Sequence, residues 1–237
     1  MSYLGVAALI GLLILVHEAG HFWVARLLGL PVARVSIGFG PRLWGWRRGR
    51  TEYRISALPI GGYVVLDLAD AEDYFRIPLA RRIAFSAAGP LANLLLPLPL
   101  FALLNVVTHG FSLQGILFAP PTQTLEAAVR ILALLPSAFA SPENLSGLVG
   151  IVAQSSELTL SFTRTVGFAI MMSLNLAVFN LLPLPLLDGG KIVVDLLHRL
   201  SPRGVLRYLE PVTAGGLLLL LALFVLVTAL DIFRLAA

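Results

Sequence analysis

The residues best suited to chemistry form one short run near the start of the chain, His17-Glu18-Ala19-Gly20-His21. Side chains at positions i and i+4 of a helix share a face, so both imidazoles can bind one metal ion from the same side. Glu18 lies beside them and can accept a proton from a metal-bound water, whose pKa zinc lowers to roughly 7. The alternative is a polar trio that steadies helix packing. A functional site is favoured because such residues are costly within an apolar span.

The chain has no cysteine, so any metal ion must be held by His, Asp or Glu. Catalytic zinc normally takes three protein ligands. The predicted third ligand is Asp188, at the end of the run Asn180-Leu-Leu-Pro-Leu-Pro-Leu-Leu-Asp188. Pro183 and Pro185 cannot lie in an unbroken helix, so the helix is expected to open before Asp188. The alternative for Asp188 is an N-cap of a helix over residues 191–200.

Asn180 lies next to this opened stretch. Its amide can hold a substrate backbone or the oxyanion that develops during attack on a carbonyl. It can equally satisfy helix ends that Pro183 leaves unpaired. Both interpretations stay open on the sequence alone. Gly89-Pro90, with Asn93 nearby, predicts a kink in a second apolar segment.

The elements that position these residues must lie in lipid. Of the 237 residues, 58% are hydrophobic and 13% are charged, whereas soluble domains are about 25% charged. A spanning helix needs about 20 mostly apolar residues. We therefore predict a mainly α, polytopic membrane protein with about four transmembrane helices, over residues 3–28, 83–107, 166–187 and 212–230.

Basic residues predict how the chain is oriented. Nine arginines lie between the first two predicted spans and four basic residues between the last two, whereas the intervening loop holds two. Both basic loops are therefore expected in the cytoplasm and both termini outside it. These loops favour anionic lipid headgroups, and without a nucleic-acid motif no nucleic-acid partner is expected.

The first basic loop also carries strand patterns. Residues 32–39 and 51–57 alternate as strands do, with glycines between them, and residues 58–66 are apolar enough to enter the bilayer. Strands at that depth need backbone partners within the protein, which favours a re-entrant β-hairpin over the region 32–66. The alternative is a hairpin on the cytoplasmic surface. Farther on, residues 122–135 predict an amphipathic helix at the outer interface, with a short buried helix as the alternative.

Two motifs in the order found here carry a family resemblance: His-Glu-Ala-Gly-His in the first span and Asn180-Leu-Leu-Pro-Leu-Pro-Leu-Leu-Asp-Gly-Gly190 in the third. The chain resembles the site-two protease family of intramembrane zinc metalloproteases, most nearly the bacterial branch that includes the regulator-of-sigma-E protease. Further matches are Ser36–Pro41, Thr51–Tyr53, Leu58–Tyr63, Ala87–Asn93 and Asn144–Gly147.

The resemblance implies one Zn²⁺ held by His17, His21 and Asp188, with Glu18 as the general base. It also implies that the Gly38–Leu66 region, with Gly61 and Gly62, receives the substrate as an added β-strand. Asn180 and Pro183 match positions that the family uses for its substrate.

The implied function is zinc-dependent cleavage of transmembrane segments. The substrates would be transmembrane proteins or signal-peptide remnants, and the location a bacterial-type inner membrane. Relatives of this branch usually carry PDZ domains after the second span, and no such strand pattern occurs here, so residues 1–237 are expected to form a single domain. The alternatives are a membrane transporter that uses the same His/His/Asp site and a non-catalytic scaffold.

Overall fold

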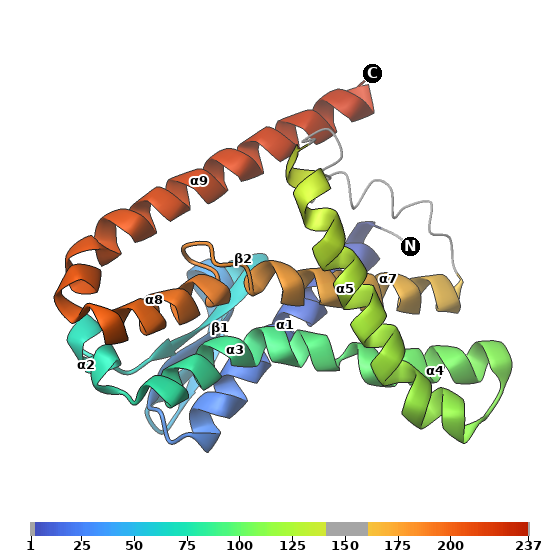
Figure 1. Ribbon diagram of the computed structural model, residues 1–237, viewed down its shortest axis with the longest axis horizontal. Helices are drawn as coiled ribbons and strands as arrows, with labels where there is room; N and C mark the ends of the chain where they lie inside the picture. The colour runs from blue at the N-terminus through green and yellow to red at the C-terminus, as the bar shows by residue number, and fades with distance from the viewer. Residues whose placement is uncertain (1–2, 141–160, 237) are drawn as a thin grey trace. The chain divides into compact units, whose positions relative to one another are not determined.

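The computed structural model describes residues 3–140 and 161–236 (Figure 1). In those ranges the chain is mainly helical, with one antiparallel sheet. The elements are α1 (Tyr3–Leu27), β1 (Val32–Arg48), β2 (Thr51–Leu66), α2 (Ala71–Arg76), α3 (Leu79–Leu95), α4 (Pro97–His109), the π-helix η1 (Gln114–Phe118), α5 (Ala119–Ala140), α7 (Phe162–Asn180), α8 (Asp188–Leu200) and α9 (Pro202–Ala236).

Four stretches of the described chain are helical, long and apolar enough to cross a membrane, which confirms the predicted number of spans: Gly5–Leu27, Leu79–His109, Phe162–Asn180 and Pro202–Phe233. The first predicted span, residues 3–28, agrees closely with α1. The second is divided into α3 and α4 at Leu96, immediately before Pro97. Proline lacks an N–H and is suited to the first position of a helix, so α4 begins there.

The third and fourth spans differ from prediction at their ends. Helix α7 ends at Asn180, seven residues before the predicted limit of 187, because Pro183 and Pro185 prevent it from continuing. Helix α9 begins at Pro202, well before the predicted residue 212. The helix expected over residues 122–135 is present within α5. Its expected place at the outer interface stays a prediction.

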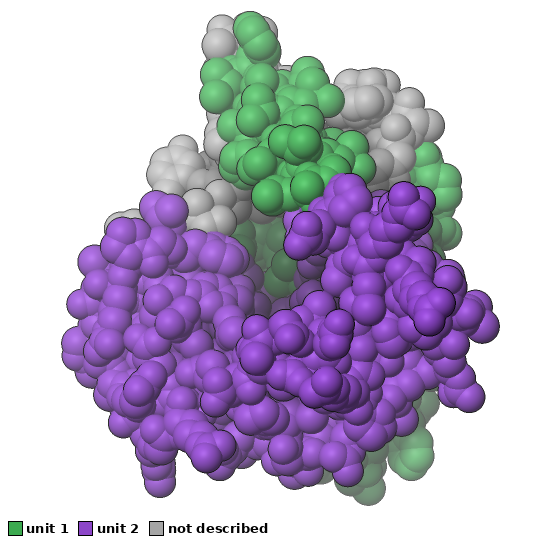
Figure 2. All heavy atoms as spheres, turned by 90° about the vertical axis from the view of Figure 1, so that its left-hand side faces the viewer, with its two compact units in different colours: residues 1–10, 94–178, 214–237 green, residues 11–93, 179–213 purple. Residues whose placement is uncertain are grey.

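The described chain separates into two compact units, coloured in Figure 2. Unit 1 comprises residues 1–10, 94–178 and 214–237, and unit 2 comprises residues 11–93 and 179–213. In unit 1 the core cluster joins Ile131 of α5 to Val166, Ile170 and Leu174 of α7. All predicted site residues belong to unit 2.

The sheet of unit 2 is built from two long, bent strands. Val35, in the first half of β1, pairs with both Tyr53 and Val64 of β2. The sheet therefore runs in the order 62–66, 32–37, 52–56, 42–48, and residues 62–66 form one of its edges. Glycine allows the chain to bend here: Gly61 has φ +91°, a conformation that other residues rarely adopt. Both predicted strands are present and longer than expected, while their depth in the membrane stays a prediction.

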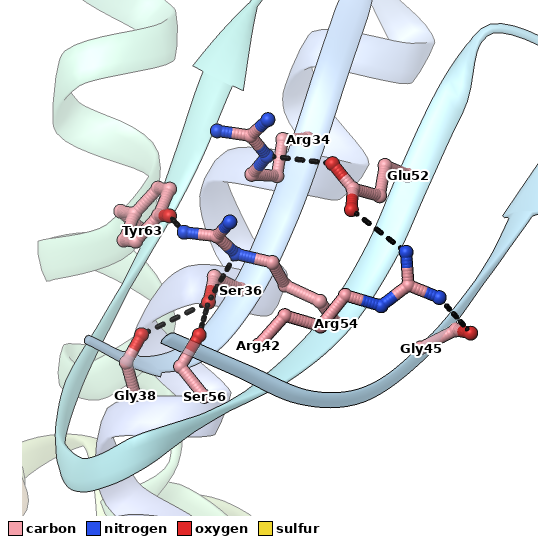
Figure 3. Close-up of polar contacts among 9 residues, drawn as sticks. All are labelled: Arg34, Ser36, Gly38, Arg42, Gly45, Glu52, Arg54, Ser56 and Tyr63. Atoms are coloured by element: carbon pink, nitrogen blue, oxygen red, sulfur yellow. Dashed lines mark hydrogen bonds and ion pairs between the residues drawn. The ribbon is translucent and has the colours of Figure 1, made fainter. Parts of the chain in front are cut away.

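Polar contacts hold the edge segment to the rest of the sheet (Figure 3). Arg54, from the segment 52–56, reaches across β1 and donates to the hydroxyl of Tyr63 in the edge segment. The same guanidinium donates to Ser36 Oγ at 3.3 Å, and Ser36 contacts Ser56 Oγ at 3.0 Å. Glu52 accepts a hydrogen bond from Arg34 at 2.8 Å, and this ion pair joins the segments 52–56 and 32–37. These contacts fix the edge relative to β1.

Close packing joins α1, α3 and the sheet. Ala25, Leu30, Val32 and Phe85 form the buried cluster of unit 2. A Cβ added at Gly20 would lie 2.5 Å from the carbonyl oxygen of Ala88, so glycine lets α1 approach α3 closely. The result is that the face of α1 carrying His17 and His21 lies against α3.

Candidate metal centre and adjoining pocket

Helix α1 presents the two histidines as their spacing predicted. His17 and His21 are one helical turn apart, and both are buried, with 8% and 5% of their surfaces exposed. Their Nε2 atoms lie 3.2 Å from each other. Two imidazoles therefore point their ring nitrogens at one position from a single helix.

Asp188 reaches the same position from the other end of the sequence. Helix α7 ends at Asn180, and a short loop over residues 181–187 leads to Asp188, the first residue of α8. In this loop Leu186 has φ +74°, the one positive value among the described residues other than glycine. A Cβ at Gly189 or Gly190 would overlap carbonyl groups of the loop, so the two glycines let α8 begin directly against it. This turn aims the Asp188 carboxylate at α1.

The three side chains converge on a small triangle of donor atoms. Asp188 Oδ2 lies 3.0 Å from His17 Nε2 and 3.2 Å from His21 Nε2, and Asp188 as a residue is 4% exposed. Tetrahedral zinc with bonds of about 2.0–2.1 Å separates its ligand atoms by about 3.3 Å. The triangle has nearly those dimensions, and His₂-carboxylate is a donor set that catalytic zinc uses. These residues therefore fit a zinc ion.

Contacts outside the triangle orient two of the three groups. His21 Nδ1 donates to the carbonyl oxygen of Phe85 at 2.8 Å, which leaves the Nε2 lone pair of a neutral ring free for a metal. Lys191 Nζ donates to Asp188 Oδ1 at 3.0 Å, whereas Asp188 Oδ2 faces the two imidazoles. The N-cap of α8 is Leu187, without a side-chain cap, so capping is not what occupies the carboxylate.

A buried ion pair links α8 to α3 two turns beyond Asp188. Asp195 Oδ1 lies 2.6 Å from Arg82 Nη1, with side-chain exposures of 0% and 4%. The Tyr74 hydroxyl donates to the other oxygen at 3.1 Å. Burial raises the pKa of the Asp195 carboxyl, and the charge of Arg82 opposes that shift. Asp195 and Asp188 are seven residues apart and share a helical face, so this pair helps to set the rotation of α8.

A pocket of about 280 Å³ opens beside the triangle. Its wall includes Glu18, Gly62 and Asn180, three of the residues selected from the sequence. A Cβ at Gly62 would lie 2.8 Å from Glu18 Cγ, so glycine leaves room for the acid between α1 and the edge segment. The pocket can therefore hold a small group beside both the donor triangle and a carboxylate.

The other two predicted substrate residues lie elsewhere. Gly61 contributes a bend in β2 and would, with a Cβ, overlap the ring of Phe39. Pro183 lines a second, apolar cavity next to the pocket. The motif Asn144–Gly147 lies outside the described residues.

Several site residues were not named individually from the sequence, although Phe39 and Tyr63 lie within the region assigned to the substrate. Phe39, Tyr63 and Lys191 line the pocket, and Gly89 lies so close that a Cβ there would be 2.6 Å from His17 Nε2. Gly89-Pro90 was interpreted as a kink and as part of the family match Ala87–Asn93, and not as part of the metal site. A glycine inside an apolar helix often marks a place where another group approaches the helix closely, and this was the signal available for Gly89.

Comparison with known proteins decides the family. The profile of peptidase family M50 matches residues 5–223. The chain belongs to peptidase family M50. Four apolar helices agree with a membrane protein of this family, and zinc, the metal that the triangle fits, is the cofactor of this peptidase.

Relatives carry names that agree with this. The chain is similar to "Putative zinc metalloprotease CPE1693" of Clostridium perfringens, with 27% identity over 323 positions covering 93% of the chain and 95% of the relative. It is also similar to "Putative zinc metalloprotease FN1322" of Fusobacterium nucleatum, with 23% identity covering 99% of each. A "Putative zinc metalloprotease" of Xylella fastidiosa is 47% identical over 105 positions, covering 40% of the chain and 24% of the relative. The two long alignments exceed 237 positions, so those relatives contain residues without a counterpart here.

Proposed function

We propose that this M50 peptidase is a zinc-dependent intramembrane endopeptidase that cleaves transmembrane segments of other membrane proteins. The observation that carries the proposal is the donor triangle of His17, His21 and Asp188, which includes two residues of α1, a helix long and apolar enough to span a membrane. Metal ligands on a spanning helix favour chemistry at membrane depth.

In this proposal each residue of the site has one task. His17, His21 and Asp188 hold the ion, with His21 oriented by Phe85 and Asp188 by Lys191. When bound, zinc supplies a Lewis acid that makes a water acidic near neutral pH. The Glu18 carboxylate, in the same pocket, accepts the proton of the attacking water. Asn180 donates to the oxygen on which negative charge develops.

The substrate must be extended before it can be cut, because a helix keeps its peptide groups hydrogen-bonded. We propose that the edge segment 62–66 binds the unwound substrate as an added strand. This segment pairs with β1 on one side, and Gly62 borders the pocket that holds Glu18. Gly61 supplies the bend in β2 that precedes the edge segment, and Pro183 would contact the substrate from the wall of the neighbouring cavity.

We further propose the surroundings predicted from the sequence: a bacterial-type inner membrane, termini outside the cytoplasm, a re-entrant sheet and an interfacial helix within α5. In this view residues 1–237 form one catalytic domain without a PDZ module. Relatives matched over 95% and 99% of their length contain residues without a counterpart here, which agrees with this proposal. Substrates would be transmembrane proteins or signal-peptide remnants.

The test uses the protein purified in detergent with zinc and a transmembrane reporter peptide. Glu18→Gln should lower kcat by at least about 100-fold, the usual contribution of a general base, while zinc content stays unchanged. Glu126→Gln, at an exposed position of α5, is the matched control and should behave as wild type. Mass spectrometry should locate the cut inside the apolar segment. Equal cleavage by wild type and Glu18→Gln, together with zinc flux in liposomes that depends on His17, would establish a transporter instead.

A further inference from the structure

A second cavity of about 610 Å³ adjoins the metal pocket within unit 2. It lies among the end of β2, α2, α8 and the first turns of α9. It shares four wall residues with the metal pocket: Val64, Phe85, Leu186 and Lys191. Its volume is in the range of sites that enclose small organic ligands. The two spaces therefore lie on either side of a common wall.

The polar side chains on the wall of this cavity are already paired. Tyr74 donates to Asp195 at 3.1 Å, and Asp195 also binds the buried Arg82. Lys191 donates to Asp188 at 3.0 Å, and Thr213 donates to the carbonyl oxygen of Leu209 at 2.7 Å. The remaining side chains of the wall are aliphatic or aromatic. Most of the wall offers no hydrogen-bonding side chain, so the cavity is better suited to an apolar occupant than to a polar one.

The edge of the sheet leads from one space to the other. Gly62, Tyr63 and Val64 border the metal pocket, and Val64, Val65 and Leu66 border the cavity. A strand advances about 3.3 Å per residue, so Leu66 lies about 13 Å along the edge from Gly62. Suppose that a substrate strand pairs with this edge and has its scissile peptide in the metal pocket. Substrate residues two to four positions from the scissile bond would then lie over the cavity.

We propose that this cavity is a specificity pocket for a bulky apolar side chain, such as Leu, Phe or Met, located two to four residues from the scissile bond. The inference rests on the proposed function and adds a sequence preference to it. The shared wall and the shared strand edge favour a substrate side chain over a lipid acyl chain as the occupant. An apolar transmembrane segment supplies such side chains at most positions.

Kinetics give the first test. In a reporter with a mapped cleavage site, replacing Leu by Ala at the responsible position should lower kcat/KM by about tenfold or more, because roughly three buried carbon atoms are lost. Val193→Phe should fill the cavity from α8, lowering kcat/KM for the Leu reporter to the level of the Ala reporter. Leu196→Phe, at an exposed position of the same helix outside the cavity wall, is the matched control and should keep the preference.

Crosslinking gives a second test that does not depend on cleavage. The chain has no cysteine, so single cysteines can be introduced without background. In a Glu18→Gln background, cysteines are introduced one at a time along the peptide and an added mild oxidant, such as oxidised glutathione, is supplied. Val193→Cys should then form a disulfide with the peptide cysteine at one or two positions, two residues apart, and Leu196→Cys should not. The whole 237-residue chain, solubilised in detergent, is used throughout.

The outcomes separate this inference from the proposed function. Glu18-dependent cleavage with neither a Leu preference nor a crosslink at Val193→Cys would overturn the pocket and leave the peptidase activity in place. A position-specific crosslink without Glu18-dependent cleavage would overturn the proposed activity and keep the pocket. A copurified phospholipid that is released by Val193→Phe, without any peptide crosslink, would identify a lipid site and overturn the substrate assignment.

Discussion

Replacing Gly89 by alanine should remove the metal and leave the fold intact. Gly89 lies in α3, one turn after the carbonyl group of Phe85 that orients His21. A Cβ at this position would lie 2.6 Å from His17 Nε2 and 2.7 Å from His17 Cε1, and closer still to His21 Nε2. The added methyl group therefore meets both imidazoles at the atoms that face the metal.

The size of the effect follows from these distances. Ordinary van der Waals contact of a Cβ begins near 3.4 Å, so the His17 ring must move by about 0.8 Å. Metal–ligand distances tolerate changes of about 0.2 Å, so at least one imidazole is lost as a ligand. Loss of a group that merely orients a ligand weakens metal binding by about 10–100-fold. Gly89→Ala should therefore weaken zinc binding by more than about 100-fold.

The fold should survive because the imidazoles are the ends of rotatable side chains and can swing aside. The assay is zinc affinity by competition with a chromophoric chelator, with thermal unfolding in the same detergent followed with and without zinc. Gly11→Ala on α1 is the matched control, since a Cβ there would have no atom within 4 Å. Gly11→Ala should bind zinc as the wild type does.

Two results would refute this reasoning. If folded Gly89→Ala binds zinc with wild-type affinity, then the ion is not held by the His17 and His21 side chains as they are arranged here. If Gly89→Ala fails to fold while Gly11→Ala folds, then the imidazoles cannot give way, and the packing of α1 against α3 is less tolerant than the structure indicates.

Two further predictions concern charged pairs. Asp195→Leu leaves the buried Arg82 guanidinium without its carboxylate and should lower the free energy of unfolding by about 3–5 kcal/mol in unfolding titrations. Adding Arg82→Met removes the unpaired charge and should recover most of that loss. A double variant no more stable than Asp195→Leu would contradict this. The hydrogen bond from Arg34 lowers the pKa of Glu52, so the pair stabilises the sheet above the unfolded-state pKa of about 4.3, and this contribution is lost as the pH falls through the lower folded-state pKa. The difference in thermal midpoint between wild type and Glu52→Gln should accordingly shrink from about pH 6 to about pH 3, and a difference independent of pH would exclude the pair as its cause.

Local rules explain what could be predicted in advance. The i, i+4 spacing of His17 and His21 needs only helix geometry, and the helix itself follows from a long apolar run. The end of α7 before Asp188 follows from Pro183 and Pro185, because proline cannot donate the hydrogen bond that a helix requires. The exact ends of the spans were less predictable. Helix α9 begins at Pro202 and includes polar residues before residue 212, which can lie either in a helix or in a loop.

Contacts between distant parts of the chain could not be predicted in the same way. Arg82 was counted only as one of several basic residues that set orientation, yet it is buried against Asp195, 113 residues later. Its pairing depends on how α3 and α8 pack, which no local pattern encodes. The double pairing of β1 likewise required the register of the whole sheet, because each half of β2 alone resembles an ordinary strand.

The sequence by itself determined the class of this protein, its number of candidate spans and the chemical types of its metal ligands, because hydropathy, helical spacing and proline act within a few residues. Tertiary structure alone decided that Asp188, 171 residues from His17, reaches the two imidazoles, that Gly89 leaves them room, and that an apolar cavity adjoins the metal pocket beside the sheet edge. The physical reason is that these features are made by side chains and backbones brought together across the chain, where close packing and not local preference sets which atoms meet.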